Sequence, residues 1–490
     1  MTINISTVPL NTLTPGVFVE FDSSHAVRGV SIQPHDTLIT GQMTSSGSAV
    51  AGQVYLVSSG EEAAALFGRK SQLYRMVVAY KRIDSLTPLY VVALADNAGG
   101  TAATGSFVWT GTATETGELP LYIGGRRISV AVSKDDTAAT IETAALAACA
   151  LELDLPVTVA GDAGSGLDLT AVNKGTVGNQ IMLGVALLPG ERVPAGISVT
   201  VTPMASGATD PVYSAVVTAM GEDQYHTVVA SCQDTTNVGY LVTELESRWG
   251  AMRAIEGVLF ISKYDTQGNL TSYGNGFNSQ TLVAVGAEKS AALPLPYETA
   301  AMVAAVSALQ AQSDPARAMV GAALSGAYAA PRGARFTRAQ RNTLLSDGIA
   351  TVRAASDGRL QIERLVTTYQ TNSQGAADTA YQDLYLVRTL AAYRYSVRVR
   401  IASKFGNFKL ADDGNEVSGQ DMVTPAILTA ELLAHFQDCR ELGWVENFEQ
   451  FKREILIQRD PNDPNRVNGI LPPDFINAFM VGAFSVQFRR

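Results

Sequence analysis

Residues 210–330 alternate between apolar strand patterns and helical patterns, and this rhythm limits the possible folds more than any other feature of the chain. Short apolar runs bounded by turn residues are typical of buried strands, and longer periodic runs are typical of helices. We expect strands at His226–Ser231, Gly257–Ser262 and Thr281–Gly286, and helices at Asn237–Trp249 and Glu298–Gln312. A β-α-β-α order of this kind predicts a parallel sheet with helices on its faces.

Two Gly/Ala/Thr-rich stretches, at Asp96–Ser106 and near Met204–Asp210, are typical of linkers and predict an inserted domain between them. Within it we expect a strand, a strand, a helix and two further strands: Ser106–Thr112, Arg126–Val132, Thr137–Leu151, Val157–Ala160 and Leu167–Ala171. The chain as a whole is expected to be a multidomain α/β and α+β protein. Its expected parts are an N-terminal arm (1–22), the N-terminal part of the body (23–100), a protruding α+β insertion (101–205), a central α/β domain (206–335), a C-terminal α+β domain (336–483) and a C-terminal β arm (484–490).

Residues 331–490 combine helix caps with turn signals, which predicts a mixture of helices and strands. Thr337, with Gln340 three residues later, fits a capping box. The expected elements are a helix from Thr337, a hairpin turn at Asp357–Gly358, a helix from Asp378 to about Lys404, a helix from Thr424 that ends at Gly443, and a strand over Phe448–Arg459.

The last residues of the sequence alternate between apolar and polar side chains. Phe484, Val486 and Phe488 would point to one side of a strand, and the residues between them to the other. A terminal strand with an apolar edge needs a partner, and another subunit is the natural one if its own domain offers none. A second short strand is expected near the N-terminus, where Val17, Phe18, Val19 and Phe21 follow a Pro-Gly pair, so both ends are expected to act as arms.

Composition excludes several classes of function. The net charge of −10 argues against nucleic acid as the main partner, because phosphate binding needs a basic surface. The three cysteines are far apart, so neither a disulfide framework nor a zinc site is expected. The sequence contains no secretory signal pattern and no apolar run of about 18–20 residues, so we expect a protein made in the cytoplasm without membrane insertion.

Catalytic signals are weak, and we expect no catalytic residues, cofactor or metal. The serine-hydrolase elbow, the zinc-protease motif and the phosphate-loop motif are all absent from the sequence. His226, with Asp234 or Asp223 nearby, is the best catalytic candidate, although a hydrogen-bonded histidine at a sheet end is the simpler interpretation. The glycine-rich segment Gly161–Gly166 is more typical of a turn than of a phosphate loop.

The expected helix Thr424–Leu442 carries an acidic stripe. Leu428, Leu432 and Phe436 form one apolar face, while Glu431, His435, Asp438 and Glu441 fall near another. Such a stripe is either a solvated surface or a docking surface for a basic partner, and the sequence leaves both interpretations open.

Several segments resemble a known family. Thr14–Glu20 (TPGVFVE) resembles the opening of contractile tail sheath proteins. The segments FTRAQRNTLLSDGIATVR, LYLVRTLAAYRYSVRVRIASKF and NDPNRVNGILPPDFINAFMVGAFSVQFR resemble sheath proteins of Mu-like contractile-tailed bacteriophages, and the similarity covers essentially the whole chain.

This resemblance implies a structural protein whose central domain has a fold called subtilisin-like. Subunits of the family stack as rings, expected to be hexameric, around a tail tube, and they contract to drive the tube through the host envelope. The implied partners are further copies of the chain, the tube protein, and the baseplate and tail terminator proteins; the implied location is the virion tail, after assembly in the host cytoplasm.

The resemblance also implies roles for particular residues. Arms from neighbouring subunits add strands to a C-terminal sheet, and an acidic C-terminal helix contacts the tube. The arms would be Val17–Phe21 and Phe484–Phe488, the accepting strand would contain Phe451, Arg453, Ile455 and Ile457, and the tube contacts would be Glu431, Asp438 and Glu441. Two alternatives remain open: the sheath of a phage-derived bacterial injection machine, and a subtilisin-like serine hydrolase.

Overall fold

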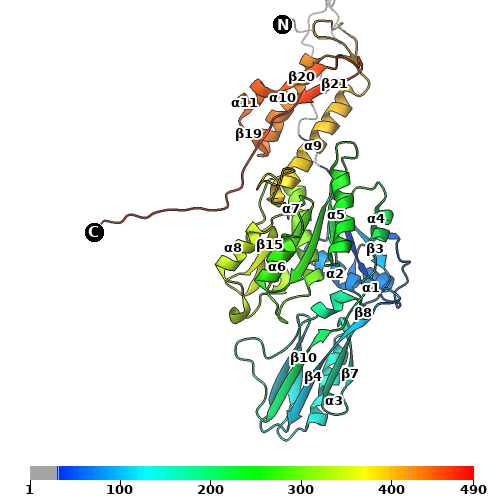
Figure 1. Ribbon diagram of the computed structural model, residues 1–490, viewed down its shortest axis with the longest axis vertical. Helices are drawn as coiled ribbons and strands as arrows, with labels where there is room; N and C mark the ends of the chain where they lie inside the picture. The colour runs from blue at the N-terminus through cyan, green and yellow to red at the C-terminus, as the bar shows by residue number, and fades with distance from the viewer. Residues whose placement is uncertain (1–29, 31–32, 416, 418, 490) are drawn as a thin grey trace, which may run out of the picture. The chain divides into compact units, whose positions relative to one another are not determined.

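The structure, a computed structural model, describes residues 30, 33–415, 417 and 419–489 (Figure 1). The chain divides into two compact units. The first, called the body here, contains Pro34–Ala391 and the residues from 478 onward; the second, the C-terminal unit, contains Ala392–Asn477.

The body is built around one nine-stranded sheet with the order β14-β16-β15-β13-β12-β11-β1-β3-β2. The strands are β1 (Thr37–Gln42), β2 (Val54–Leu56), β3 (Leu89–Leu94), β11 (Thr227–Ala230), β12 (Val258–Tyr264), β13 (Leu282–Ala287), β14 (Ala323–Tyr328), β15 (Ile349–Ala354) and β16 (Arg359–Arg364). The six central strands, from β3 to β15, pair in parallel, and antiparallel strands lie at both edges. The predicted parallel α/β sheet is therefore present.

Helices cover both faces of this sheet, because successive side chains of a buried strand point to opposite sides. Ile39, Val229 and Phe260 belong to one apolar core together with residues of α2 (Gln72–Lys81) and α7 (Pro296–Ser313). Leu38 and Val228 belong to a second core with the helices of the other face. Those helices are α4 (Ser214–Met220), α5 (Thr235–Trp249), α6 (Gln267–Gly274) and α8 (Arg338–Ser346); α1 (Gly60–Phe67) precedes α2.

The sheet also contains strands from outside residues 210–330, the segment whose pattern predicted it. Strands β1 and β3 come from residues 37–94, and β15 and β16 lie beyond residue 335, where a domain boundary was expected. Strand β15 belongs to the sheet because its first four residues, Ile349–Val352, are all buried there. The turn at Asp357–Gly358 joins β15 to the antiparallel β16, as predicted.

Residues 102–205 form two smaller sheets, with the orders β10-β4-β8-β7 and β6-β5-β9, and a helix. Their elements are β4 (Ala102–Gly111), β5 (Gly117–Ile123), β6 (Arg126–Val132), α3 (Ala138–Leu151), β7 (Val157–Gly161), β8 (Gly166–Lys174), β9 (Leu183–Val185) and β10 (Ile197–Ala205). All five predicted elements are present, and β5, β9 and β10 were not predicted. Thr101 and Ala208 exchange two backbone hydrogen bonds of 3.0 and 3.2 Å, so the chain enters and leaves this inserted region at adjacent points.

The helix α9 (Leu384–Phe405) begins in the body and ends in the C-terminal unit. It starts six residues later than predicted, because the Asp378 carboxylate instead accepts hydrogen bonds from the Tyr369 hydroxyl (2.6 Å) and a backbone N–H in the preceding loop. The remaining elements are β17 (Lys409–Leu410), β18 (Met422–Val423), α10 (Pro425–Glu441), β19 (Val445–Glu446), α11 (Phe448–Glu454), β20 (Leu456–Arg459), β21 (Val467–Ile470) and β22 (Asp474–Phe475).

Both predicted helix caps in the C-terminal half are confirmed. Thr337 and Gln340 form a capping box at the start of α8, and the Thr424 hydroxyl accepts from the backbone N–H of Ile427 at the start of α10. Among the described helices, none is both long and apolar enough to cross a bilayer.

Candidate assembly site

The C-terminal segment exposes a regular series of apolar side chains. Phe484, Val486 and Phe488 are 84–87% exposed, and Phe479 and Val481 are nearly as open. From residue 476 to 489 the described chain forms no helix and no strand, so the expected terminal strand has no pairing partner within the described residues. Burying one such side chain stabilises a complex by about 1.5–3 kcal/mol, so this segment is suited to binding another surface. Val17, Phe18, Val19 and Phe21, the expected N-terminal arm, lie outside the described residues.

The predicted accepting strand over Phe448–Arg459 is wrong in its first half. Phe451 and Arg453 lie on α11, Ile455 caps that helix, and only Ile457 lies in a strand, β20. Phe448 and Phe451 are three residues apart and both contact Phe436, with ring centroids 5.9 and 4.3 Å away. Residues three apart share a face of a helix but lie on opposite faces of a strand, so this packing favours the helix.

A two-stranded sheet lies directly after this helix. Strand β20 pairs antiparallel with β21, from Leu456 opposite Ile470 to Arg459 opposite Val467, across the segment Pro461–Asn465. Leu456 and Ile470 are 49% and 61% exposed. Within the described residues each strand pairs on one side only, and a free strand edge can accept a further strand.

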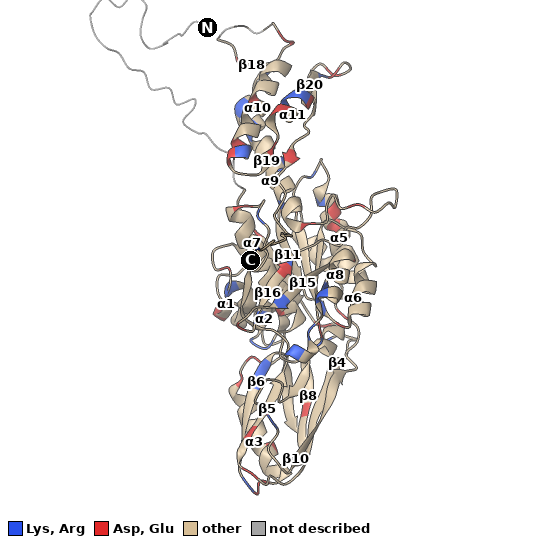
Figure 2. Cartoon of the chain, turned by 90° about the vertical axis from the view of Figure 1, so that its left-hand side faces the viewer, with Lys and Arg blue, Asp and Glu red and all other residues tan. Residues whose placement is uncertain are grey.

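Two of the three predicted tube contacts form ion pairs inside the C-terminal unit. Both acidic and basic residues are marked along the ribbon of this unit (Figure 2). Glu431 pairs with Arg400 and, at 2.8 Å, with Lys404, both on α9; Asp438 also pairs with Arg400. Burial would raise the pKa of Glu431, but the hydrogen bonds from Lys404 and Arg400 outweigh it and hold that pKa below its ordinary value. Glu441 is exposed at the end of α10.

His435, expected on the acidic stripe, is buried between the same two helices. Its Nε2 lies 3.0 Å from the Ser396 hydroxyl, and its ring lies 5.7 Å from that of Tyr393. Burial and the charge of Arg400 lower the pKa of His435 to about 4, so the ring is neutral at pH 7. Most of the predicted acidic stripe therefore faces α9, and its open part is at the C-terminal end of α10.

Among the residues that the structure describes, no catalytic set surrounds His226. The Nδ1 of His226 accepts the backbone N–H of Asp36 (3.1 Å), and its ring lies beside that of His35. Asp234 caps α5 through the backbone N–H of Asn237 (2.9 Å). Burial, followed by the charge of Arg388, lowers the pKa of His226 to about 3, which agrees with a structural histidine at a sheet end.

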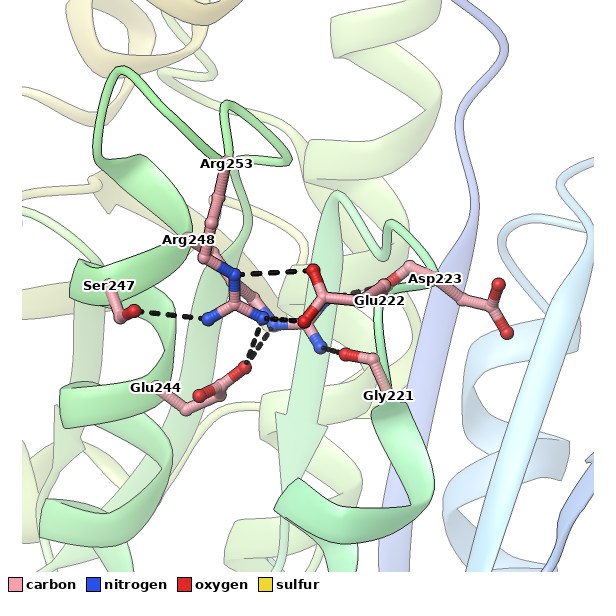
Figure 3. A network of polar contacts seen from close by, with 7 residues as sticks. All are labelled: Gly221, Glu222, Asp223, Glu244, Ser247, Arg248 and Arg253. Carbon is pink, nitrogen blue, oxygen red and sulfur yellow. Dashed lines mark hydrogen bonds and ion pairs between the residues drawn. The ribbon is translucent and has the colours of Figure 1, made fainter.

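Asp223, the other candidate partner of His226, belongs to a network that holds the loop after α4 against α5 (Figure 3). Its backbone carbonyl accepts from Arg248 (2.6 Å), while its carboxylate points away from the arginines. Arg248 and Arg253 both donate to Glu244, at 2.7 and 2.9 Å. Each donor in this network is directed to a protein acceptor, so its role is to fix the loop.

The glycine-rich loop Gly161–Gly166 is also closed to a phosphate. The Glu142 carboxylate on α3 accepts the backbone N–H groups of Gly164 (2.8 Å) and Gly166 (3.1 Å), which a phosphate would need. In the described part of the chain, no group of three or more His, Cys, Asp or Glu residues is placed to hold a metal ion.

Comparisons with known proteins agree with an assembly protein. Residues 206–368 match the phage tail sheath protein central domain, and residues 376–489 match the phage tail sheath C-terminal domain. The chain belongs to the phage tail sheath protein family, and its homologues are structural proteins of contractile tails.

The relationship to Mu-like phages is supported at full length. The chain is 35% identical over 490 residues to the Mu-like prophage FluMu tail sheath protein of Haemophilus influenzae, covering all of both chains. The fold is similar to the contracted helical sheath of the anti-feeding prophage (TM-score 0.51, 12% identity, 98% and 99% of the two chains covered). It is also similar to a sheath tail protein of Listeria innocua (TM-score 0.50, 12% identity, 91% and 93% covered).

Proposed function

We propose that this chain is the structural subunit that polymerises as stacked hexameric rings around a phage tail tube and contracts to deliver the genome. The observation that carries the proposal is the C-terminal segment, where Phe484, Val486 and Phe488 are exposed in alternation. A monomer gains nothing from three open apolar side chains, whereas a polymer can bury them between copies.

The proposed linkage is strand exchange between subunits. The segment Phe484–Phe488 of one copy, and the N-terminal arm Val17–Phe21, would extend the β20–β21 sheet of other copies. Backbone hydrogen bonds would supply affinity, and the alternating side chains would set the register. Burying three side chains at about 1.5–3 kcal/mol each offsets part of the cost of association, so many weak links could hold one lattice.

The proposed tube contact is the C-terminal end of α10. Glu441 is the open carboxylate, while Glu431 and Asp438 hold the helix in place through Arg400. An exposed ion pair contributes about 0–1 kcal/mol, so such contacts could hold a ring and still release it during contraction.

Contraction is proposed to use energy stored at assembly, because the extended lattice would be a kinetic trap above the contracted one. A baseplate signal would release the first ring, and the arms would keep neighbouring subunits linked as they move. The inserted region 101–205 is proposed to protrude from the body and not to carry the polymer contacts. Assembly in the host cytoplasm, with a terminator protein closing the tail, completes the proposal.

A second candidate is the sheath of a phage-derived bacterial injection machine, which the similarity in fold to the anti-feeding prophage sheath favours. The serine-hydrolase alternative is not favoured, because His226 lies beside His35 and an arginine instead of a carboxylate and a nucleophile.

Electron microscopy of the purified protein tests the proposal. We expect hollow helical tubes from the full chain and only small particles after deletion of residues 484–490. The matched control is Leu151→Ser, which removes an equally exposed apolar side chain (81%) from the inserted region and should leave the tubes intact. Tubes of normal length from the deletion variant would rule out the C-terminal arm.

A further inference from the structure

A pocket of about 90 Å³ opens where the inserted region meets helices α2 and α7. Its wall includes three guanidinium groups, from Arg75, Arg82 and Arg126, and two carboxylates, from Asp154 and Glu298. It is called the arginine pocket here. The sheath proposal leaves it without a role, since the proposed arms and tube contact lie elsewhere in the chain.

Two of the three arginines are already paired. Nε of Arg75 lies 2.8 Å from Oε1 of Glu298, and the Arg75 guanidinium also donates to the backbone carbonyl of Asp154. Nη2 of Arg126 lies 2.7 Å from Oδ2 of Asp154. The pair of Arg75 with Glu298 joins α2 to α7, and the pair of Arg126 with Asp154 lies within the inserted region, so the bond from Arg75 to the Asp154 carbonyl is the one that crosses between them. The two ion pairs use both carboxylates of the pocket.

Arg82 is the remaining cation. It is exposed, and no ion pair joins it to any residue that the structure describes. Its guanidinium occupies the space beside Gly326 on β14, where the Cβ of any other residue would overlap Arg82 Nη1. Arg82 caps the C-terminus of α2, where the helix dipole favours a cation. The helix dipole does not require the side chain to lie in the pocket; the missing side chain at Gly326 is what leaves room for the guanidinium there.

We propose that the arginine pocket binds one small oxyanion, of carboxylate or phosphate size. The lining carries one more positive than negative charge, and the surplus is Arg82, which forms no ion pair among the described residues. A guanidinium presents parallel N–H donors that match two oxygens of such a group. The volume holds several water molecules, so one carboxylate or phosphate group fits and a nucleotide does not.

Equilibrium dialysis of the full chain against inorganic phosphate, at constant ionic strength, tests this. We expect one phosphate per chain, and at least tenfold weaker binding for Arg82→Gln, whose side chain is exposed and whose folding can be checked by thermal unfolding. Arg192→Gln is the matched control, because Arg192 is 72% exposed and lies outside the pocket. Acetate, which mimics an acidic side chain, should compete for the same site.

Absence of binding by both phosphate and acetate overturns the proposal, as does unchanged affinity in Arg82→Gln.

A second measurement distinguishes two sources of the oxyanion. This measurement rests on the proposed polymerisation. If the group is a carboxylate of a neighbouring copy, assembled chains should take up no phosphate and Arg82→Gln should weaken assembly. If it is a free ion, assembled and free chains should bind phosphate equally. Failure to polymerise would count against the sheath proposal alone, since the dialysis of free chains is independent of it.

Discussion

The imidazole rings of His35 and His226 lie with their centroids 4.7 Å apart inside the body, beside the buried guanidinium of Arg388. Arg388 donates to the backbone carbonyl of His226 and to the hydroxyl of Thr227 (2.7 Å), and His35 Nε2 lies 2.9 Å from the same hydroxyl. Burial is the main cause that lowers the pKa of both histidines, and the charge of Arg388 adds to it. Both rings must therefore be neutral in the folded protein.

This arrangement predicts that stability falls as pH falls below about 6.5. The unfolded chain binds protons near the ordinary histidine pKa of about 6.5, whereas folded His226 binds one only near pH 3. Between these values the unfolded state holds more protons, so each such histidine removes up to about 1.4 kcal/mol of stability per pH unit. Urea unfolding of the full chain between pH 7 and 4.5 measures this slope.

The double variant His35→Gln/His226→Gln should flatten that slope, leaving the part that His435 contributes through its own lowered pKa. An unchanged slope in the double variant would show that other groups control the acid sensitivity of the chain.

Phe451 should behave as a core residue of α11, not as a member of a strand edge. It is 1% exposed and stacks on Phe436, so Phe451→Ala should lower the free energy of unfolding by about 3–5 kcal/mol. Arg453→Ala, on the exposed side of the same helix, should change it by less than about 0.5 kcal/mol. Thermal unfolding followed by circular dichroism compares the two, and equal effects would contradict the packing.

Substitutions at two positions of α10 should affect different properties: Glu431 should affect stability, and Glu441 should affect binding to the tube. Glu431→Gln weakens the pairs with Arg400 and Lys404, and we expect a loss of about 1–3 kcal/mol in the free energy of unfolding. Glu441→Lys should leave stability unchanged but reduce assembly on purified tubes. Glu449→Lys, an equal charge reversal at an exposed position of α11, is the control. If Glu441→Lys assembles on tubes as well as the control does, the proposed tube contact fails.

Replacing residues 102–205 by a short glycine linker should give a folded chain that still polymerises. The midpoint of thermal unfolding should drop, because the backbone N–H of Gln72 loses its acceptor on Asn173 (3.1 Å) and Arg75 loses the Asp154 carbonyl. Electron microscopy measures polymerisation, and thermal unfolding measures stability. A soluble, folded product without tubes would assign polymer contacts to the inserted region.

The helix starts at Thr337 and Thr424 could be predicted from the sequence, because their causes lie within a few residues. Thr337 with Gln340, and Thr424 before Pro425, marked helix starts through side chains that satisfy free backbone N–H groups. The parallel sheet could be predicted as well, because the alternation of strand and helix patterns in residues 210–330 is also a local feature of the sequence. The position of β15 in that sheet was missed, since strand order depends on contacts far apart in sequence.

The errors have physical causes as well. Phe448–Arg459 contains enough apolar residues for a strand, and only contact with Phe436 selects a helix for its first half. Likewise, the partners of Glu431 on α10 lie on α9, and no local pattern indicates the register between two packed helices. The sequence shows the acidic stripe, but it does not show that the stripe faces α9.

The pair of hydrogen bonds between Thr101 and Ala208 gives this chain a natural grafting point. A folded module whose own ends lie close together could replace residues 102–205 without stretching the strands that lead to it. Because a sheath would repeat this junction in every subunit, a cargo fused there would be displayed at the lattice spacing along the whole particle.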